Sequence, residues 1–186
     1  MLSFAQTSSP TSAVVERVFN ALFAERLNTV LIGGAAEPFY RPADDEDARH
    51  RIFYREDFVS SSLHEVAHWM VAGEARRLLP DWGYWYAPDG RDAAQQQVFE
   101  QMEVKPQALE WLLHAACGLR FRVSLDNLSD GAGDGSAFKD RVYEQACHCI
   151  RNGVHERMQC FYQALAETFS GAGALQDLVL SRADLD

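Results

Sequence analysis

Apolar residues at helical spacing form the first regular pattern in the chain, between residues 14 and 23. Their separations of one, three and four residues are typical of a helix with one buried face. The apolar positions are Val14, Val15, Val18, Phe19, Leu22 and Phe23. We therefore predict an amphipathic helix here, preceded by a frayed segment, residues 1–12, that is rich in serine and threonine.

Two short apolar runs, residues 28–32 and 51–54, predict strands because they combine β-branched or aromatic side chains over strand-like lengths. Residues 37–47, which lie between them, contain Pro38, Pro42 and a run of acids, and this composition predicts a loop. The pattern thus indicates a small sheet that follows the first helix.

The clearest helix boundaries in the chain are those of residues 63–79. This segment contains good helix formers and ends at Pro80. The three serines at 60–62 supply hydroxyl groups that can cap its first turn. The aromatic block at 82–92 is interrupted by glycine and proline, so we predict either a strand that enters a turn or an irregular loop.

Helical patterns dominate the rest of the chain. Residues 93–117 predict a helical region that Pro106 either kinks or divides into two helices. The glycine- and aspartate-rich residues 124–136 predict a loop. Residues 138–150 and 156–169 predict two closing helices.

Composition places these elements in one ordinary globular domain. The chain has 186 residues, 47% of them apolar, and neither an internal repeat nor a long linker divides it. We expect one helix-dominated α+β domain over residues 1–186, with a small sheet. The 17 basic and 27 acidic residues give a net charge of −10, and the basic residues are scattered. This charge disfavours nucleic-acid binding and suits a basic ligand.

The chain shows no sign of a membrane or secreted location. It has no run of about 18 apolar residues, as a membrane span requires, and its first residues lack the basic and apolar regions of a secretory signal. The four cysteines, Cys117, Cys147, Cys149 and Cys160, form no disulfide framework. We predict a reduced, cytoplasmic protein.

The strongest chemical signal is the sequence His64-Glu65-Val66-Ala67-His68 on the helix predicted at 63–79. Residues four apart lie about one turn apart on the same helix face, so both imidazoles can reach one metal ion. This is the H-E-x-x-H arrangement found on the zinc-binding helix of zincins. We therefore expect a metal site on this helix and a catalytic role for the domain.

A third, anionic ligand is expected about 35 residues downstream. Glu100 and Glu103 are three residues apart, so they share a helix face and either carboxylate can point at the metal. We favour Glu103 because it lies just before Pro106, and we keep Glu100 as a carboxylate that either supports a metal ligand or faces the substrate. The alternative is that both are solvated acids on a helix surface.

Two histidines and a carboxylate do not by themselves identify the reaction. The same set binds zinc in hydrolases and iron(II) in non-haem oxygenases. In a zinc metallopeptidase, Glu65 would be the base for the attacking water. A third alternative is a binding module in which the metal site is structural and closed.

Longer stretches of the sequence resemble the bacterial elongation factor P hydroxylases. The resemblance covers about residues 19–127. It is carried by His64-Glu65-x-x-His68-Trp69, Gly83-Tyr84-Trp85-Tyr86-x-Pro88-Asp89-Gly90-Arg91-Asp92 and Phe99-Glu100-x-x-Glu103-Val104-Lys105-Pro106-Gln107. Motifs of this length are far more specific than the H-E-x-x-H pattern alone.

The resemblance implies a non-haem iron monooxygenase that uses dioxygen to hydroxylate the lysyl-modified lysine of elongation factor P. It also implies iron(II) as the cofactor and His64, His68 and Glu103 as its ligands. In such an enzyme Glu65 would orient a bound water or carry a proton. A long cationic lysyl-lysine arm would be guided by carboxylates and aromatic faces. The candidates for this substrate contact are Glu100, Tyr84, Trp85, Tyr86 and Asp89.

Overall fold

The computed structural model describes residues 9–83, 93–124, 135–169 and 171–186, and within these ranges helices outnumber strands. The helices are α1 (Ser12–Phe23), α2 (Val59–Val71), α3 (Ala93–Ala116), α4 (Ser136–Asn152) and α5 (Glu156–Phe169); the strands are β1 (Thr29–Ala35), β2 (Phe39–Arg41) and β3 (His50–Arg55). Short 3₁₀ turns are η1 (Arg76–Leu78), η2 (Pro80–Gly83), η3 (Leu175–Asp177) and η4 (Arg182–Leu185). The predicted helix-dominated α+β class with a small sheet is confirmed.

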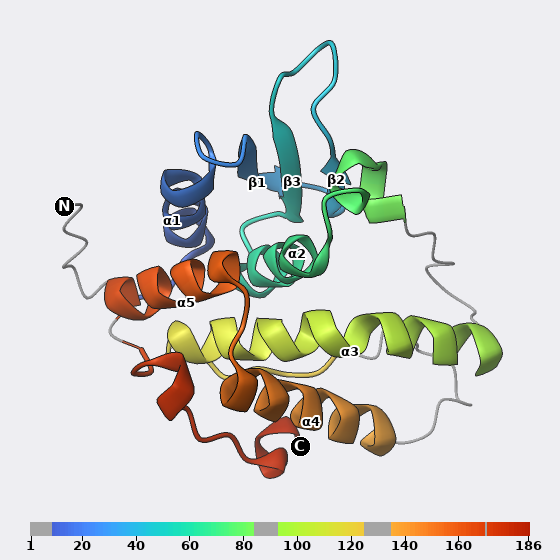
Figure 1. Cartoon of the computed structure of the whole chain (residues 1–186), viewed down its shortest axis with the longest axis vertical. Helices are drawn as coiled ribbons and strands as arrows, with labels where there is room; N and C mark the ends of the chain where they lie inside the picture. Colours follow the sequence, from blue (N-terminus) through green and yellow to red (C-terminus); the bar gives the residue numbers. More distant parts are fainter. Residues whose placement is uncertain (1–8, 84–92, 125–134, 170) are drawn as a thin grey trace.

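The elements are stacked in layers, with the sheet at one end of the molecule and α4 at the other (Figure 1). Helices α1 and α2 pack against the sheet, α3 packs against α2, and α4 covers the other side of α3. Helix α5 contacts both α1 and α3. Helix α2 therefore lies at the centre of the fold, between the sheet and α3.

The sheet has the order β1-β3-β2, with β1 parallel and β2 antiparallel to the central strand β3. Both strands predicted from the apolar runs are confirmed. The loop prediction for 37–47 was wrong at β2, where Tyr40 pairs with Ile52. Three residues are too few to show a strand pattern. Their flanking prolines are tolerated because β2 is an edge strand that pairs on one side only.

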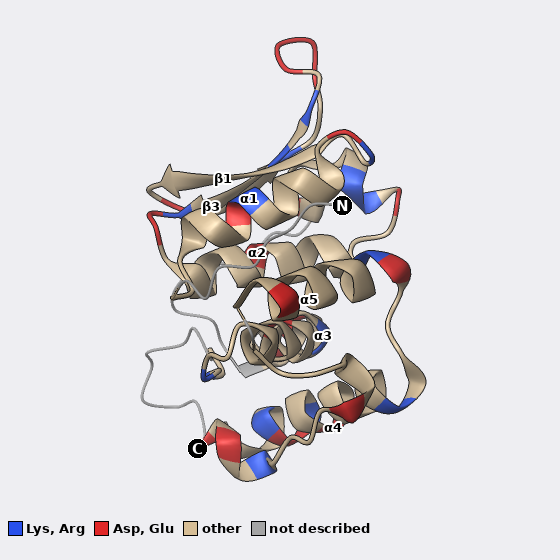
Figure 2. Cartoon of the chain, turned by 90° about the vertical axis from the view of Figure 1, so that its left-hand side faces the viewer, with Lys and Arg blue, Asp and Glu red and all other residues tan. Residues whose placement is uncertain are grey.

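The Asn20 side chain anchors α1 to the sheet, because it bonds both backbone groups of Leu31 in β1 as a neighbouring strand would. The Asn20 amide donates to the carbonyl oxygen of Leu31 at 3.0 Å and accepts from the Leu31 N–H at 2.8 Å. The predicted buried face of this helix is confirmed, and Val15 and Phe19 are fully buried. Beyond β2, the loop to β3 projects from the sheet with acidic residues at its tip (Figure 2).

Helix α2 has different ends from those predicted. It begins at Val59, so the three serines lie inside its first turns, and the N-cap residue is Phe58, which supplies no side-chain hydrogen bond. The hydroxyl of Ser62 instead donates to the carbonyl oxygen of Val59 at 2.7 Å. Serine hydroxyls can satisfy such carbonyls within a helix, so the serines did not mark its start.

The helix also ends at Val71, eight residues before the predicted end. Two side chains next to or in the first turn of α5 contact the last carbonyl groups of α2. His155 lies 2.6 Å from the Met70 oxygen, and Arg157 donates to the oxygens of Met70 and Ala72 at 3.3 Å. Because both groups come from residues more than 80 positions away, local sequence could not reveal this termination.

Helix α3 continues through Pro106 as one element, so of the two alternatives predicted there, a division into two helices was wrong. Proline lacks the N–H that would bond the carbonyl four residues earlier, but one missing bond costs a long helix less than a break when both halves are packed. On either side of α3, α2 and α4 provide that packing. The closing helices α4 and α5 are confirmed, with α4 longer at both ends than predicted.

None of the helices in the described ranges has both the length and the apolar character that a membrane crossing needs.

An aromatic cluster joins α1, α2 and α5 in the core. Trp69 lies with its ring centroid 5.1 Å from those of both Phe19 and Phe23, and Phe161 lies 5.6 Å from Phe19. The guanidinium of Arg157 stacks over the Trp69 ring at 4.6 Å. Trp69 directly follows His68, so this cluster fixes the part of α2 that carries the histidines.

We predict that Phe19→Ala lowers the free energy of unfolding by about 3–5 kcal/mol, because it leaves a cavity among tightly packed rings. Chemical denaturation monitored by circular dichroism measures the change. Phe58→Ala is the matched control: this side chain is 49% exposed, so its loss should cost less than about 1 kcal/mol. Equal effects of the two substitutions would show that the cluster does not organise the core.

Candidate metal centre

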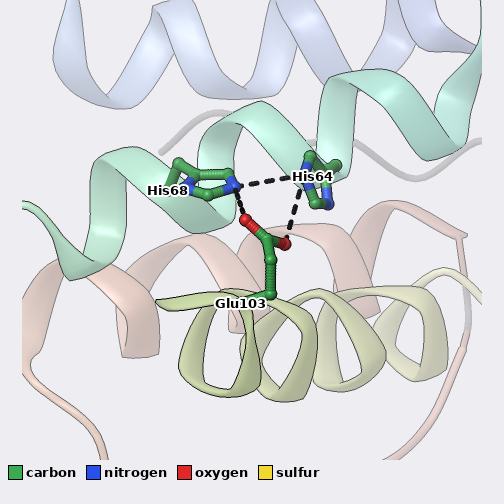
Figure 3. Close-up of side chains that lie close together, drawn as sticks. All are labelled: His64, His68 and Glu103. Atoms are coloured by element: carbon green, nitrogen blue, oxygen red, sulfur yellow. Dashed lines mark hydrogen bonds and ion pairs between the residues drawn. The ribbon is translucent and has the colours of Figure 1, made fainter. Parts of the chain in front are cut away.

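Two helices bring the predicted ligands together. His64 and His68 extend from α2, and Glu103 extends from α3 toward both of them (Figure 3). One donor atom from each of the three residues can be chosen so that all lie within 4.8 Å of one another. The structure thus joins residues that are 35 or more positions apart in the sequence.

The spacing of the donor atoms fits a first-row metal ion. The Nε2 atom of His68 lies 3.1 Å from Nε2 of His64 and 3.1 Å from Oε1 of Glu103, and His64 Nε2 lies 3.8 Å from Glu103 Oε2. Bonds of about 2.1 Å place neighbouring ligands of an octahedral ion about 3 Å apart and those of a tetrahedral ion about 3.4 Å apart. The three residues fit such an ion with small side-chain adjustments.

The ligands belong to a larger contact, the polar seam, in which every fourth residue of α2 faces α3. Its pairs are Ser60 Oγ with His114 Nε2 at 3.2 Å, His64 Nδ1 with Glu110 Oε2 at 2.8 Å, and His68 Nε2 with Glu103 Oε1 at 3.1 Å. Residue numbers rise along α2 as they fall along α3, so the two helices run antiparallel across the polar seam.

Negative charge dominates the centre. Burial alone lowers the pKa of His64, but the neighbouring carboxylates, Glu110 foremost, raise it to about 10. Burial likewise raises the pKa of Glu103, yet the imidazoles of His68 and His64 lower it to about 2. The site therefore holds an ionised carboxylate and favours a positive charge beside it, which a divalent ion supplies as well as a proton does.

Glu65, the predicted catalytic residue, is buried beside the ligands, with 8% of its surface exposed. Burial raises the pKa of its carboxyl group, and the carboxylates of Glu103 and Glu110 raise it further against the opposing effect of the histidines. Glu65 directly follows His64 on α2, while the side chain of His64 keeps 25% exposure and gives the site access to solvent.

Among the predicted substrate contacts, Glu100 is the one that lies within the described residues. Glu100 lies outside the ligand group: its carboxylate accepts from Arg141 of α4 at 2.5 Å and from Gln96 at 3.4 Å. Tyr84, Trp85, Tyr86 and Asp89 lie outside the residues that the structure describes. Their assignment to substrate binding stays a prediction.

Two polar residues near the centre were missed by the sequence analysis. Glu110 contacts His64, and Gln107 donates to the Glu103 carboxylate at 3.3 Å and to the carbonyl oxygen of Ser124 at 2.8 Å. With His114 they follow Glu103 at steps of four, three and four residues. This spacing is that of one buried helix face, here occupied by polar residues. The pattern could therefore have revealed Glu110 and Gln107 from the sequence.

The fold and the site together define a helix-dominated α+β protein with a candidate centre of two histidines and one carboxylate. The sequence profile of the elongation factor P hydroxylases matches residues 18–178. A relative from Haemophilus influenzae, an elongation factor P lysine hydroxylase, is 48% identical over 153 residues, which are 82% of this chain and 86% of the relative. The chain belongs to the elongation factor P hydroxylase family. Neither match favours the peptidase alternative.

We predict that His64→Ala, His68→Ala and Glu103→Ala each weaken iron(II) binding by more than about 100-fold, since loss of an outer partner alone costs about 10–100-fold. Anaerobic calorimetric titration measures the affinity. Glu100→Ala, which removes a carboxylate of the same helix outside the ligand group, should bind iron(II) as the unmodified chain does. The ligand set would be contradicted if Glu100→Ala lost affinity for iron(II), or if the three ligand variants kept it.

Proposed function

We propose that this protein is a non-haem iron monooxygenase that hydroxylates the lysyl-modified lysine of translation elongation factor P. The convergence of His64, His68 and Glu103 in a member of a hydroxylase family carries this proposal. Two imidazoles and one carboxylate on one side of an octahedral ion leave the opposite positions free for other molecules. The 48% identical relative supports elongation factor P lysine as the substrate.

Iron fits the proposed reaction better than zinc does. When bound, iron(II) would supply the activation of dioxygen and the oxidation of a C–H bond. Zinc has no redox chemistry, so the same ligands around zinc would suit hydrolysis instead. The helix that carries both histidines has the H-E-x-x-H sequence of zincins, and we infer that this chain uses that arrangement for an oxygenase.

The protein's own residues hold the centre and limit its contact with water. His64 and His68 would bind through their Nε2 atoms, and Glu103 would supply the one negative ligand. The side chains of His68 and Glu103 are 9% and 3% exposed, so solvent and substrate would enter beside His64, the most exposed of the three. The Glu65 carboxyl, buried next to these ligands, would orient a bound water or transfer a proton.

Carboxylates and aromatic rings would guide the cationic arm of the substrate. Glu100 lies one helical turn before Glu103 and shares its carboxylate with Arg141, so it can bind an amino group only alongside that guanidinium or in its place. Tyr84, Trp85, Tyr86 and Asp89 would supply cation–π and ionic contacts. The net charge of −10 suits a basic substrate.

We infer further that the whole chain works as one catalytic domain, because buried side chains of all five helices and the sheet form a single hydrophobic core. A substrate that takes part in translation supports a cytoplasmic location for the proposed reaction.

Incubation in air of lysylated elongation factor P with this protein, iron(II) and a reductant should add one oxygen atom to the modified lysine. Intact-mass and fragment mass spectrometry detect the added oxygen and assign it to that residue. His64→Ala should leave the substrate mass unchanged, because it removes an iron ligand. An unchanged mass with the iron-loaded unmodified chain would contradict the hydroxylase proposal.

Glu65→Gln separates the two enzyme classes in the same assay. A hydroxylase does not need a hydrolytic base, so this variant should retain a reduced rate of oxygen addition. A peptidase that depends on Glu65 would lose cleavage altogether. Peptide cleavage by the zinc-loaded chain that disappears in Glu65→Gln would establish the alternative instead.

A further inference from the structure

Glu110 contacts His64 on the ring nitrogen that faces away from the other ligands. Its Oε2 atom lies 2.8 Å from His64 Nδ1, while His64 Nε2 lies 3.1 Å from Nε2 of His68. A carboxylate only accepts hydrogen bonds, so Nδ1 must carry the proton of this contact. In a neutral imidazole that proton leaves the lone pair on Nε2, the atom on the ligand side.

The location of Glu110 argues for a dedicated role. The residue is 6% exposed, and a buried carboxylate is costly unless it is paired and hydrogen-bonded. Glu110 is not part of the group formed by His64, His68 and Glu103, whose donor atoms lie within 4.8 Å of one another. Its direct side-chain hydrogen bond in the described ranges is the one to His64, and the Oε1 atom lies 3.9 Å from His114 Nδ1.

The surroundings of Glu110 hold it in register with α2. One turn further along α3, His114 Nδ1 lies 3.0 Å from the backbone oxygen of Glu110, and its other ring nitrogen contacts Ser60 of α2 at 3.2 Å. Ser60 lies one turn before His64 on the same face. The outer pair of the polar seam thus keeps the two helices aligned at the point where Glu110 meets His64.

We propose that Glu110 is a positioning residue whose carboxylate holds His64 in the tautomer and orientation that direct Nε2 toward the metal. This inference rests on the proposed function, because it assumes that His64 binds a metal ion. Glu110 itself touches neither the metal nor the substrate and acts through His64. Outer carboxylates of this kind commonly fix metal-bound histidines and strengthen their binding.

Cobalt(II) titration of the purified chain tests the proposal through affinity and through the visible spectrum of the bound ion. Glu110→Ala should weaken cobalt binding by about 10–100-fold and shift the spectrum, because His64 loses its orienting partner. Glu110→Gln should recover part of the affinity, since its amide oxygen can still accept from Nδ1–H. Glu144→Gln, the same substitution at an exposed position of α4, is the matched control and should leave affinity and spectrum unchanged.

A second readout separates positioning from a general structural effect. In the zinc-loaded, nitrogen-15-labelled chain, NMR should show His64 protonated at Nδ1, with that proton protected by Glu110 and exchanging faster in Glu110→Gln. The Gln variant keeps the side-chain size, so it remains usable if Glu110→Ala does not fold. Protonation of His64 at Nε2 would overturn the proposal.

The cobalt titration gives different results if this proposal fails and if the proposed function fails. If His64→Ala abolishes cobalt binding while both Glu110 variants bind as tightly as the unmodified chain, Glu110 has no positioning role and the metal centre stands. If His64→Ala also binds normally, the centre itself is wrongly assigned and the inference fails with it.

Discussion

The contact between α2 and α3 contains the buried carboxylates and imidazoles of the described residues, and the candidate centre depends on it. Across the polar seam, Ser60, His64 and His68 each meet a partner from α3 at hydrogen-bonding distance. Buried carboxylates are costly without such partners, so sliding one helix along the other would leave charged groups unpaired. Away from α3, the position of α2 is fixed by the aromatic rings packed around Trp69 and by the Arg157 guanidinium, which lies over the Trp69 ring. Packing therefore sets the position of the helix, and the polar seam sets its register.

Local patterns predicted most of the elements but not all of their ends. The apolar repeat of α1 and the runs of β1 and β3 depend on neighbouring residues, so the sequence revealed them. The early end of α2 depends on His155 and Arg157, which are distant in the sequence. Strand β2 exists because β3 is available to pair with it. The continuity of α3 through Pro106 likewise reflects packing on both sides rather than helix propensity.

The sequence predicted the site residues of α2 more completely than those of α3. His64 and His68 follow from a spacing of four residues within one helix. The choice of Glu103 over Glu100 rested on its place just before Pro106, and the family resemblance strengthened it. Both residues share a face, and only the packing of α3 decides which one approaches α2. Glu110 was missed although its spacing from Glu103 continues that face. A polar residue at a buried helical position is the signal to examine in related sequences, because burial without a partner would be costly.

Anomalous X-ray diffraction at the iron absorption edge, from crystals grown without oxygen in iron(II), locates the bound ion and identifies its ligands. We expect one strong peak within bonding distance, about 2.1 Å, of His64 Nε2, His68 Nε2 and a Glu103 oxygen. We also expect Glu110 on the far side of the His64 ring, still in contact with Nδ1. A peak at other residues, or iron bound by Glu110 in place of Glu103, would show that the metal ligands are not the three residues assigned.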